Sequence, residues 1–67
     1  MEWKEITQEN AEYVHNQEKK GVMIMYARVD KDGELSQYGD DLWYYPETMA
    51  KRGRYYFFEL PPLEIKK

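Results

Sequence analysis

The fold of this 67-residue chain is decided by one segment, Val22-Met23-Ile24-Met25-Tyr26-Ala27-Arg28-Val29, and by the sequence Asp30-Lys31-Asp32-Gly33 that follows it. The first segment is too short for a core helix and rich in residues that favour extended backbone, so it predicts a buried strand. Aspartate at the first position and glycine at the fourth predict a type I turn that closes a three-residue hairpin with a glycine bulge.

The turn sets a register for the hairpin. We expect a second strand to start near Glu34 and to pair antiparallel with the first. In this register Val29 lies opposite Leu35 and Tyr26 lies opposite Tyr38. Both are apolar matches of the kind that stabilise cross-strand pairs.

A helix is predicted before the hairpin, over residues 8–20. Thr7 is placed to cap its N-terminus, and Gly21 stands where a left-handed residue ends a helix. Its apolar stripe is thin, because Ala11 and Val14 share one face with polar residues. We expect residues 1–6 to form a short extended arm.

After the hairpin, Leu42-Trp43-Tyr44-Tyr45 resumes a β-rich pattern. Residues 46–52 follow with proline first, an acid next and bases last, which favours a short helix, with a loop as the alternative. Residues 54–60 predict a strand that Pro61-Pro62 must end. Together the elements predict one small α+β domain over residues 1–67, with one N-terminal helix followed by a three- to four-stranded antiparallel β-meander.

Both faces of the predicted sheet carry apolar side chains, since apolar residues fill successive positions of the strands instead of alternating with polar ones. One thin helix covers only one face. Two hypotheses for the second face stay open. Either the terminal segments fold across it, through Trp3, Ile6, Leu63 and Ile65, or it is the interface of a homo-oligomer, expected to be a dimer, or of a partner protein.

Composition narrows the function. A chain this short has a marginal core, and without cysteine it has no disulfide to stabilise that core. We therefore expect the fold to gain stability by associating with a second copy of the chain or with another protein. The net charge of −3 disfavours general nucleic-acid binding. No apolar run is long enough for a membrane span, and the N-terminus has no signal-peptide pattern, so we expect no membrane association and a cytoplasmic location.

Catalytic and metal patterns are weak. His15 has Glu12 and Glu18 at helical spacing, the arrangement of a catalytic base with an orienting carboxylate. No serine or cysteine nucleophile accompanies it, since the one serine, Ser36, belongs to the predicted hairpin and the chain has no cysteine. Asp30, Asp32, Glu34 and Asp41 have calcium-loop spacing, but Leu35 stands where such a loop needs glycine. We therefore expect no enzyme, no metal and no cofactor.

Two sets of binding residues are predicted. The first is a partner-binding surface of aromatic strand residues and acids, namely Tyr26, Tyr38, Asp40, Asp41, Trp43, Tyr44, Tyr56 and Phe58, with an acidic rim of Asp40, Asp41 and Glu59. The alternative is a nucleotide site at Lys51, Arg52, Arg54 and Tyr55, where arginine can grip phosphate and a tyrosine ring can stack on a base.

In size, acidity, lack of cysteine and tyrosine-rich strands, the chain resembles the small accessory proteins of bacteriophages and prophages, including anti-CRISPR and other anti-defence inhibitors. The resemblance implies a non-enzymatic protein of the host cytoplasm that occupies a surface of a host protein or defence complex. The alternatives are a nucleotide or oligonucleotide binder and a structural homo-oligomer subunit.

Overall fold

The computed structural model describes residues 2–40 and 44–61, which form a four-stranded antiparallel sheet and two helices. The predicted α+β class is confirmed. In chain order the elements are β1 (Lys4–Glu5), α1 (Ala11–Lys19), β2 (Ile24–Val29), β3 (Leu35–Gly39), α2 (Pro46–Arg52) and β4 (Tyr55–Glu59).

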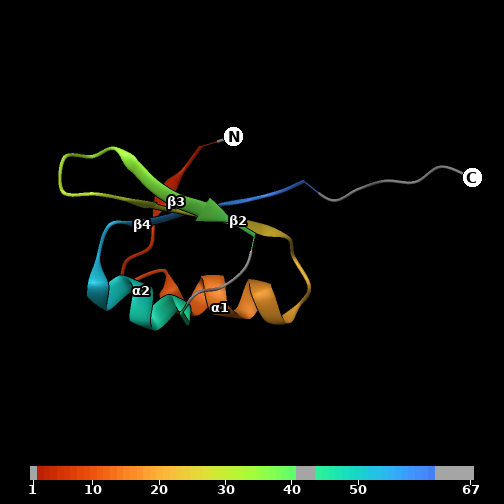
Figure 1. Cartoon of the computed structure of the whole chain (residues 1–67). Coiled ribbons are helices and arrows are strands. Elements are labelled where there is room, and N and C mark those ends of the chain that lie inside the picture. Colours follow the sequence, from red (N-terminus) through yellow and green to blue (C-terminus); the bar gives the residue numbers. More distant parts are fainter. Residues whose placement is uncertain (1, 41–43, 62–67) are drawn as a thin grey trace, which may run out of the picture.

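The strands lie in the order β1-β4-β2-β3 (Figure 1). The last strand therefore returns past the hairpin and lies between β1 and β2, pairing antiparallel with both. The fourth strand comes from the N-terminal arm, and Tyr44 and Tyr45 belong to no strand. The predictions for residues 41–43 and 62–67 lie outside the described residues.

The predicted hairpin turn is confirmed. The Gly33 backbone N–H donates to the Asp30 carbonyl oxygen at 3.0 Å, and Gly33 has a φ of +82°. The Asp30 N–H donates to the Glu34 carbonyl at 2.8 Å, and the Asp30 carboxylate accepts two further backbone N–H groups of the turn. The predicted Val29–Leu35 pair also forms.

The predicted pair of Tyr26 with Tyr38 is wrong by one residue. The register shifts after Arg28, where β3 contains one extra residue, Ser36, and Tyr38 lies opposite Ala27 instead. A β-bulge of this kind sets two residues of one strand against one of its partner. Because side chains alternate between faces, this slip places Tyr38 on the opposite face of the sheet from Tyr26.

The first helix starts later than predicted, at Ala11, and Thr7 does not cap it with its side chain. Residues 8–10 form a turn instead, in which the Ala11 N–H donates to the Thr7 carbonyl oxygen at 2.9 Å. The Asn10 side chain stabilises that turn, since its oxygen accepts the Thr7 N–H at 2.8 Å and its amide donates to the Glu5 carbonyl.

The second helix has the predicted bounds, 46–52. Its proline occupies the first turn, and the backbone N–H of Gly53 donates to the Met49 carbonyl at 2.9 Å to end it. Within residues 2–40 and 44–61, neither helix has the length and apolar character that crossing a membrane requires.

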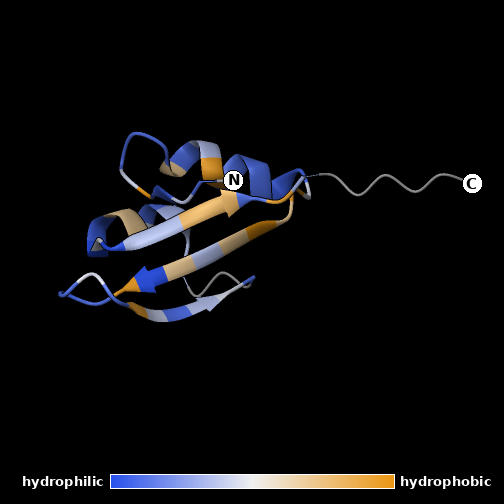
Figure 2. Cartoon of the chain, turned by 90° about the horizontal axis from the view of Figure 1, so that it is seen from above, coloured by the Kyte–Doolittle hydropathy of each residue, from blue (hydrophilic) through white to orange (hydrophobic). Residues whose placement is uncertain are grey.

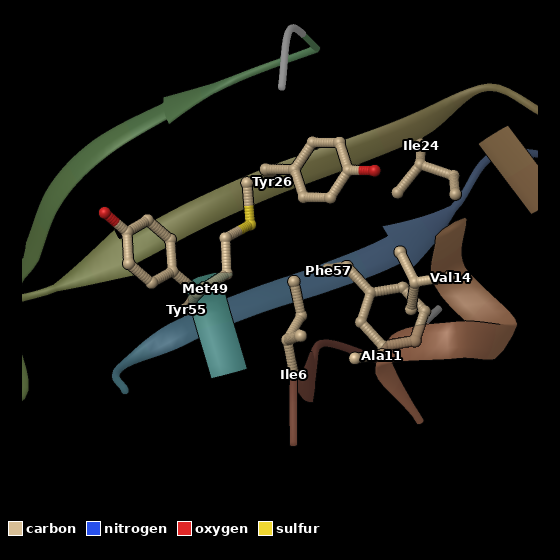
Figure 3. Close-up of a cluster of buried hydrophobic side chains, with 8 residues drawn as sticks. All are labelled: Ile6, Ala11, Val14, Ile24, Tyr26, Met49, Tyr55 and Phe57. Carbon is tan, nitrogen blue, oxygen red and sulfur yellow. The ribbon is translucent and has the colours of Figure 1, made fainter. Parts of the chain in front are cut away.

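Both helices pack on the same face of the sheet (Figure 1). Between them and the strands lies the core, drawn in Figure 3: Ile24 and Tyr26 from β2, Tyr55 and Phe57 from β4, Ala11 and Val14 from α1, Met49 from α2, and Ile6 after β1. The buried Tyr26 hydroxyl donates to the Glu18 carboxylate at 2.7 Å. Its polar atom is thereby satisfied, as a buried hydroxyl requires.

Candidate functional site

The second face of the sheet is apolar and has no described element over it. Because side chains alternate along a strand, every second residue of each strand points away from the helices and toward this second face. Figure 2, a view from above, shows apolar residues along β2 and toward the end of β4. We call this surface the open face, and its residues are Trp3, Met25, Ala27, Val29, Leu35, Tyr38, Tyr56 and Phe58.

The open face forms a shallow hollow of about 490 Å³. At one side the Trp3 ring packs edge-on against Phe58, with ring centroids 4.5 Å apart. At the other side Leu35 and Tyr38 are 60% and 67% exposed, and Trp3 itself is 46% exposed. The largest contiguous apolar patch of a monomeric protein is often an interaction site, which makes the open face a candidate for one.

Only part of the predicted partner surface lies here. Tyr38, Tyr56 and Phe58 are on the open face. Tyr26 is not, because it is completely buried under the helices. Tyr44 lines a separate hollow instead. Asp41 and Trp43 lie outside the described residues.

The described residues that were expected to cover this face lie in different places. Ile6 lies in the core beneath the helices, and Trp3 lies on the open face without covering it. Leu63 and Ile65 lie outside the described residues. Sequence reasoning did not select Leu35 as a contact residue, although its predicted pairing with Val29 was a signal for it.

The acidic rim also differs from the prediction. Glu59 faces α1, where its carboxylate accepts the Tyr13 hydroxyl at 2.6 Å and the Gln17 amide at 2.9 Å. The hydrogen bond from Tyr13, followed by that from Gln17, holds the pKa of Glu59 below its usual value. Glu59 thus joins β4 to α1. The exposed acids at the margins of the open face are Glu5 on β1, and Glu34 and Asp40 at the two ends of β3.

His15 does not use the glutamates of its own helix. Its Nδ1 lies 3.0 Å from a carboxylate oxygen of Glu47 on α2, and its ring stacks on Tyr45 with centroids 5.4 Å apart. The hydrogen bond to His15 lowers the pKa of Glu47. The chain's only serine, Ser36, lines a different hollow. The histidine therefore fastens α1 to α2.

The calcium-like spacing belongs to the hairpin turn. The Asp30 carboxylate is occupied by backbone N–H groups of that turn. In the part of the chain that the structure describes, no three histidine, aspartate or glutamate side chains come together as a metal site would need. Asp41 lies outside that part.

The predicted nucleotide cluster is divided between two places. Lys51 lines the groove between the helices, whereas Arg52 and Tyr55 line another hollow together with Arg28. Arg54 is exposed, has a φ of 67°, and is not among the lining residues of that hollow. Sequence reasoning missed Arg28, although it is the only charged residue within β2.

Two arginines and two tyrosines form a connected arrangement there. The Arg28 guanidinium lies over the Tyr55 ring, 5.7 Å from its centroid, and the Arg52 guanidinium lies over the Tyr44 ring at 4.7 Å. The two rings meet edge to face with centroids 6.3 Å apart. Cation–π contacts therefore orient both guanidiniums.

No protein-family model, curated protein or solved structure matches this chain. The fold and these surfaces are therefore the basis on which a function is inferred.

Proposed function

We propose that this chain is a non-enzymatic binding protein that docks its open face onto an apolar patch of a different protein. The observation that carries the proposal is the unequal covering of the sheet, with both helices on one face and solvent-exposed Trp3, Leu35 and Tyr38 on the other. Tryptophan and tyrosine are enriched in the cores of protein interfaces, where they bury large area at low entropic cost.

Charge indicates the chemistry of the partner. Glu5, Glu34 and Asp40 are exposed around the open face, and the chain has 13 acids against 10 bases. An apolar patch ringed by lysine or arginine would complement this rim. A second copy would bring the same acids against their own kind, so a homo-oligomer, the other predicted occupant, is the less favoured one.

The size of the face indicates a reversible contact. Four strands spaced about 4.8 Å apart and six residues of about 3.4 Å each give roughly 400 Å² in plane. Side chains that project from the sheet and the residues of the rim add to this area. Counted over both partners, the buried surface would be about 1,200 Å², the lower end of stable interfaces. We therefore expect a reversible contact at this face instead of an obligate assembly.

The separation of the chain's one histidine and one serine in two different hollows supports a non-enzymatic role. Binding alone can inhibit, since a protein that occupies a surface of an enzyme or complex blocks access to it. This is the function that the resemblance to phage accessory proteins implies, and under this proposal it would be exerted in the host cytoplasm.

Site-specific photocrosslinking tests the proposal. Benzoylphenylalanine would replace Tyr38 on the open face or Tyr45, a tyrosine of nearly equal exposure (67% and 66%) at the start of α2. After irradiation in the native cells, we expect position 38 to yield one adduct with a different protein, and position 45 to yield none. The purified partner should bind the wild type and Tyr45→Ser, bind Tyr38→Ser at least about tenfold more weakly, and bind less as salt rises.

Three results would overturn the proposal. The first is the same adduct from both positions, and the second is no adduct from position 38. The third is an adduct of position 38 with only a second copy of the chain, accompanied by a dimer in sedimentation. That result would identify the protein as the homo-oligomer subunit instead.

A further inference from the structure

A hollow on the other side of the sheet has the composition of an anion site. It has a volume of about 650 Å³, within the range of small-molecule pockets. Its described lining comes from β2, β3, α2, β4 and the residue Tyr44 before α2, and no acid is among these described residues: Arg28, Ser36, Gln37, Tyr44, Arg52 and Tyr55.

Within residues 2–40 and 44–61, the two arginines of this hollow have no carboxylate partner. The one contact at ion-pair distance there is that of His15 with Glu47, and the interactions given for Arg28 and Arg52 are with tyrosine rings. In a chain with more acids than bases, two cations that line one hollow with no acid among its described lining residues form a local positive field. A field of this kind attracts anions.

The tyrosine rings restrict the arginines before any ligand arrives. Each guanidinium lies over a ring, and the two rings contact each other, so both cations are attached to one aromatic support. A guanidinium stacked in this way keeps its N–H donors for an oxyanion and loses less side-chain entropy on binding. Ser36 and Gln37 add a hydroxyl and an amide, and Ser36 is the bulge residue of β3.

We propose that this two-arginine hollow binds the phosphate groups of a small phosphorylated molecule. Two guanidiniums, a hydroxyl and an amide match a phosphate, which has several acceptor oxygens and more than one charge, better than a single carboxylate. The site is separate from the open face, and its occupancy does not depend on the proposed partner protein. The phosphate can come from an inorganic anion or from a nucleotide.

Nuclear magnetic resonance of the full chain tests the site, with the arginine Nε–H signals as the readout. The probes are inorganic phosphate, pyrophosphate, ADP and adenosine. We expect pyrophosphate and ADP to shift the Arg28 and Arg52 signals saturably, and adenosine to leave them unchanged. Arg28→Gln and Arg52→Gln should each weaken binding about tenfold, whereas Arg54→Gln, which removes an equal charge outside the hollow, should change it less than about twofold.

The comparison of ADP with pyrophosphate identifies the source: tighter binding of ADP shows that the nucleoside is contacted, and equal binding shows that the phosphates suffice. The proposal is overturned if no probe saturates the signals up to about 10 mM. It is equally overturned if Arg54→Gln weakens binding as much as Arg52→Gln does, since the effect would then be net charge alone. Tyr38→Ser should leave phosphate binding unchanged, which separates this site from the open face.

Discussion

Tyr38 of β3 lies opposite Ala27, and not opposite Tyr26, because the bulge at Ser36 shifts the register by one residue. The two tyrosines are consequently on opposite faces of one sheet. Tyr26 is completely buried, and Tyr38 is 67% exposed.

This placement predicts opposite effects of the same substitution. Tyr38→Ala should change the free energy of unfolding by less than about 0.5 kcal/mol, because an exposed side chain loses little packing. Tyr26→Ala should lower it by about 3 to 5 kcal/mol, because it leaves a cavity in the core. Urea denaturation measures both, and equal losses would contradict the register.

The Tyr26 hydroxyl makes stability depend on alkaline pH. Burial, and then the hydrogen bond to Glu18, raise the pKa of Tyr26 above its ordinary value of 10.0. The folded state thus holds this proton more tightly than the unfolded state. The contribution of the Tyr26 hydroxyl to the free energy of unfolding is therefore fully present below pH 10 and is progressively lost as the pH rises above 10.

Tyr26→Phe tests this dependence. The variant should lose about 1.5 kcal/mol at neutral pH through the missing hydrogen bond. Its stability should also fall less steeply than that of the wild type above pH 10, measured by urea denaturation at a series of pH values. Tyr38→Phe serves as the control, because Tyr38 is 67% exposed on the other face of the sheet. An unchanged alkaline slope in Tyr26→Phe would refute the assignment.

Glu59 should make the free energy of unfolding depend on pH in the acid range. Its hydrogen bonds from Tyr13 and Gln17 lower its pKa, so its contribution is present above the ordinary pKa of 4.5 and is lost as pH falls below that value. The contribution is at most about 1 kcal/mol, because solvent screens the pair. Glu59→Gln should flatten the stability profile below pH 4.5, whereas Glu34→Gln, at an exposed position outside any element, should not.

A substitution of Gly33 should destabilise the fold through backbone conformation alone. It has a φ of +82°, and a Cβ built there would meet no atom within 4 Å. Gly33→Ala should therefore lower the free energy of unfolding by about 1 kcal/mol through backbone strain alone, and Gly33→Asn by less, since asparagine tolerates the left-handed region better. Thermal denaturation of the two variants measures the difference, and a larger loss in the asparagine variant would exclude strain as the cause.

Local signals in the sequence were enough for most of the elements. The turn at Asp30 and Gly33, the helix that starts at Pro46 and the last strand depend on residues a few positions apart, whose backbone preferences act wherever the chain lies. The same holds for the two apolar faces of the sheet, because side chains of a strand alternate in any register. The excess of apolar strand surface over helix cover was therefore readable from the residues alone.

The candidate sites were less predictable, because each depends on contacts between distant segments. His15 meets Glu47 from 32 positions away, and Arg28 joins Arg52 in one hollow only because β4 lies beside β2. A single bulge residue decides which face receives Tyr38. The sequence by itself determined the helices, the hairpin and the surplus apolar face, through short-range preferences. Tertiary packing alone decided which side chains share a surface, because strand order and register follow from the free energy of the whole core.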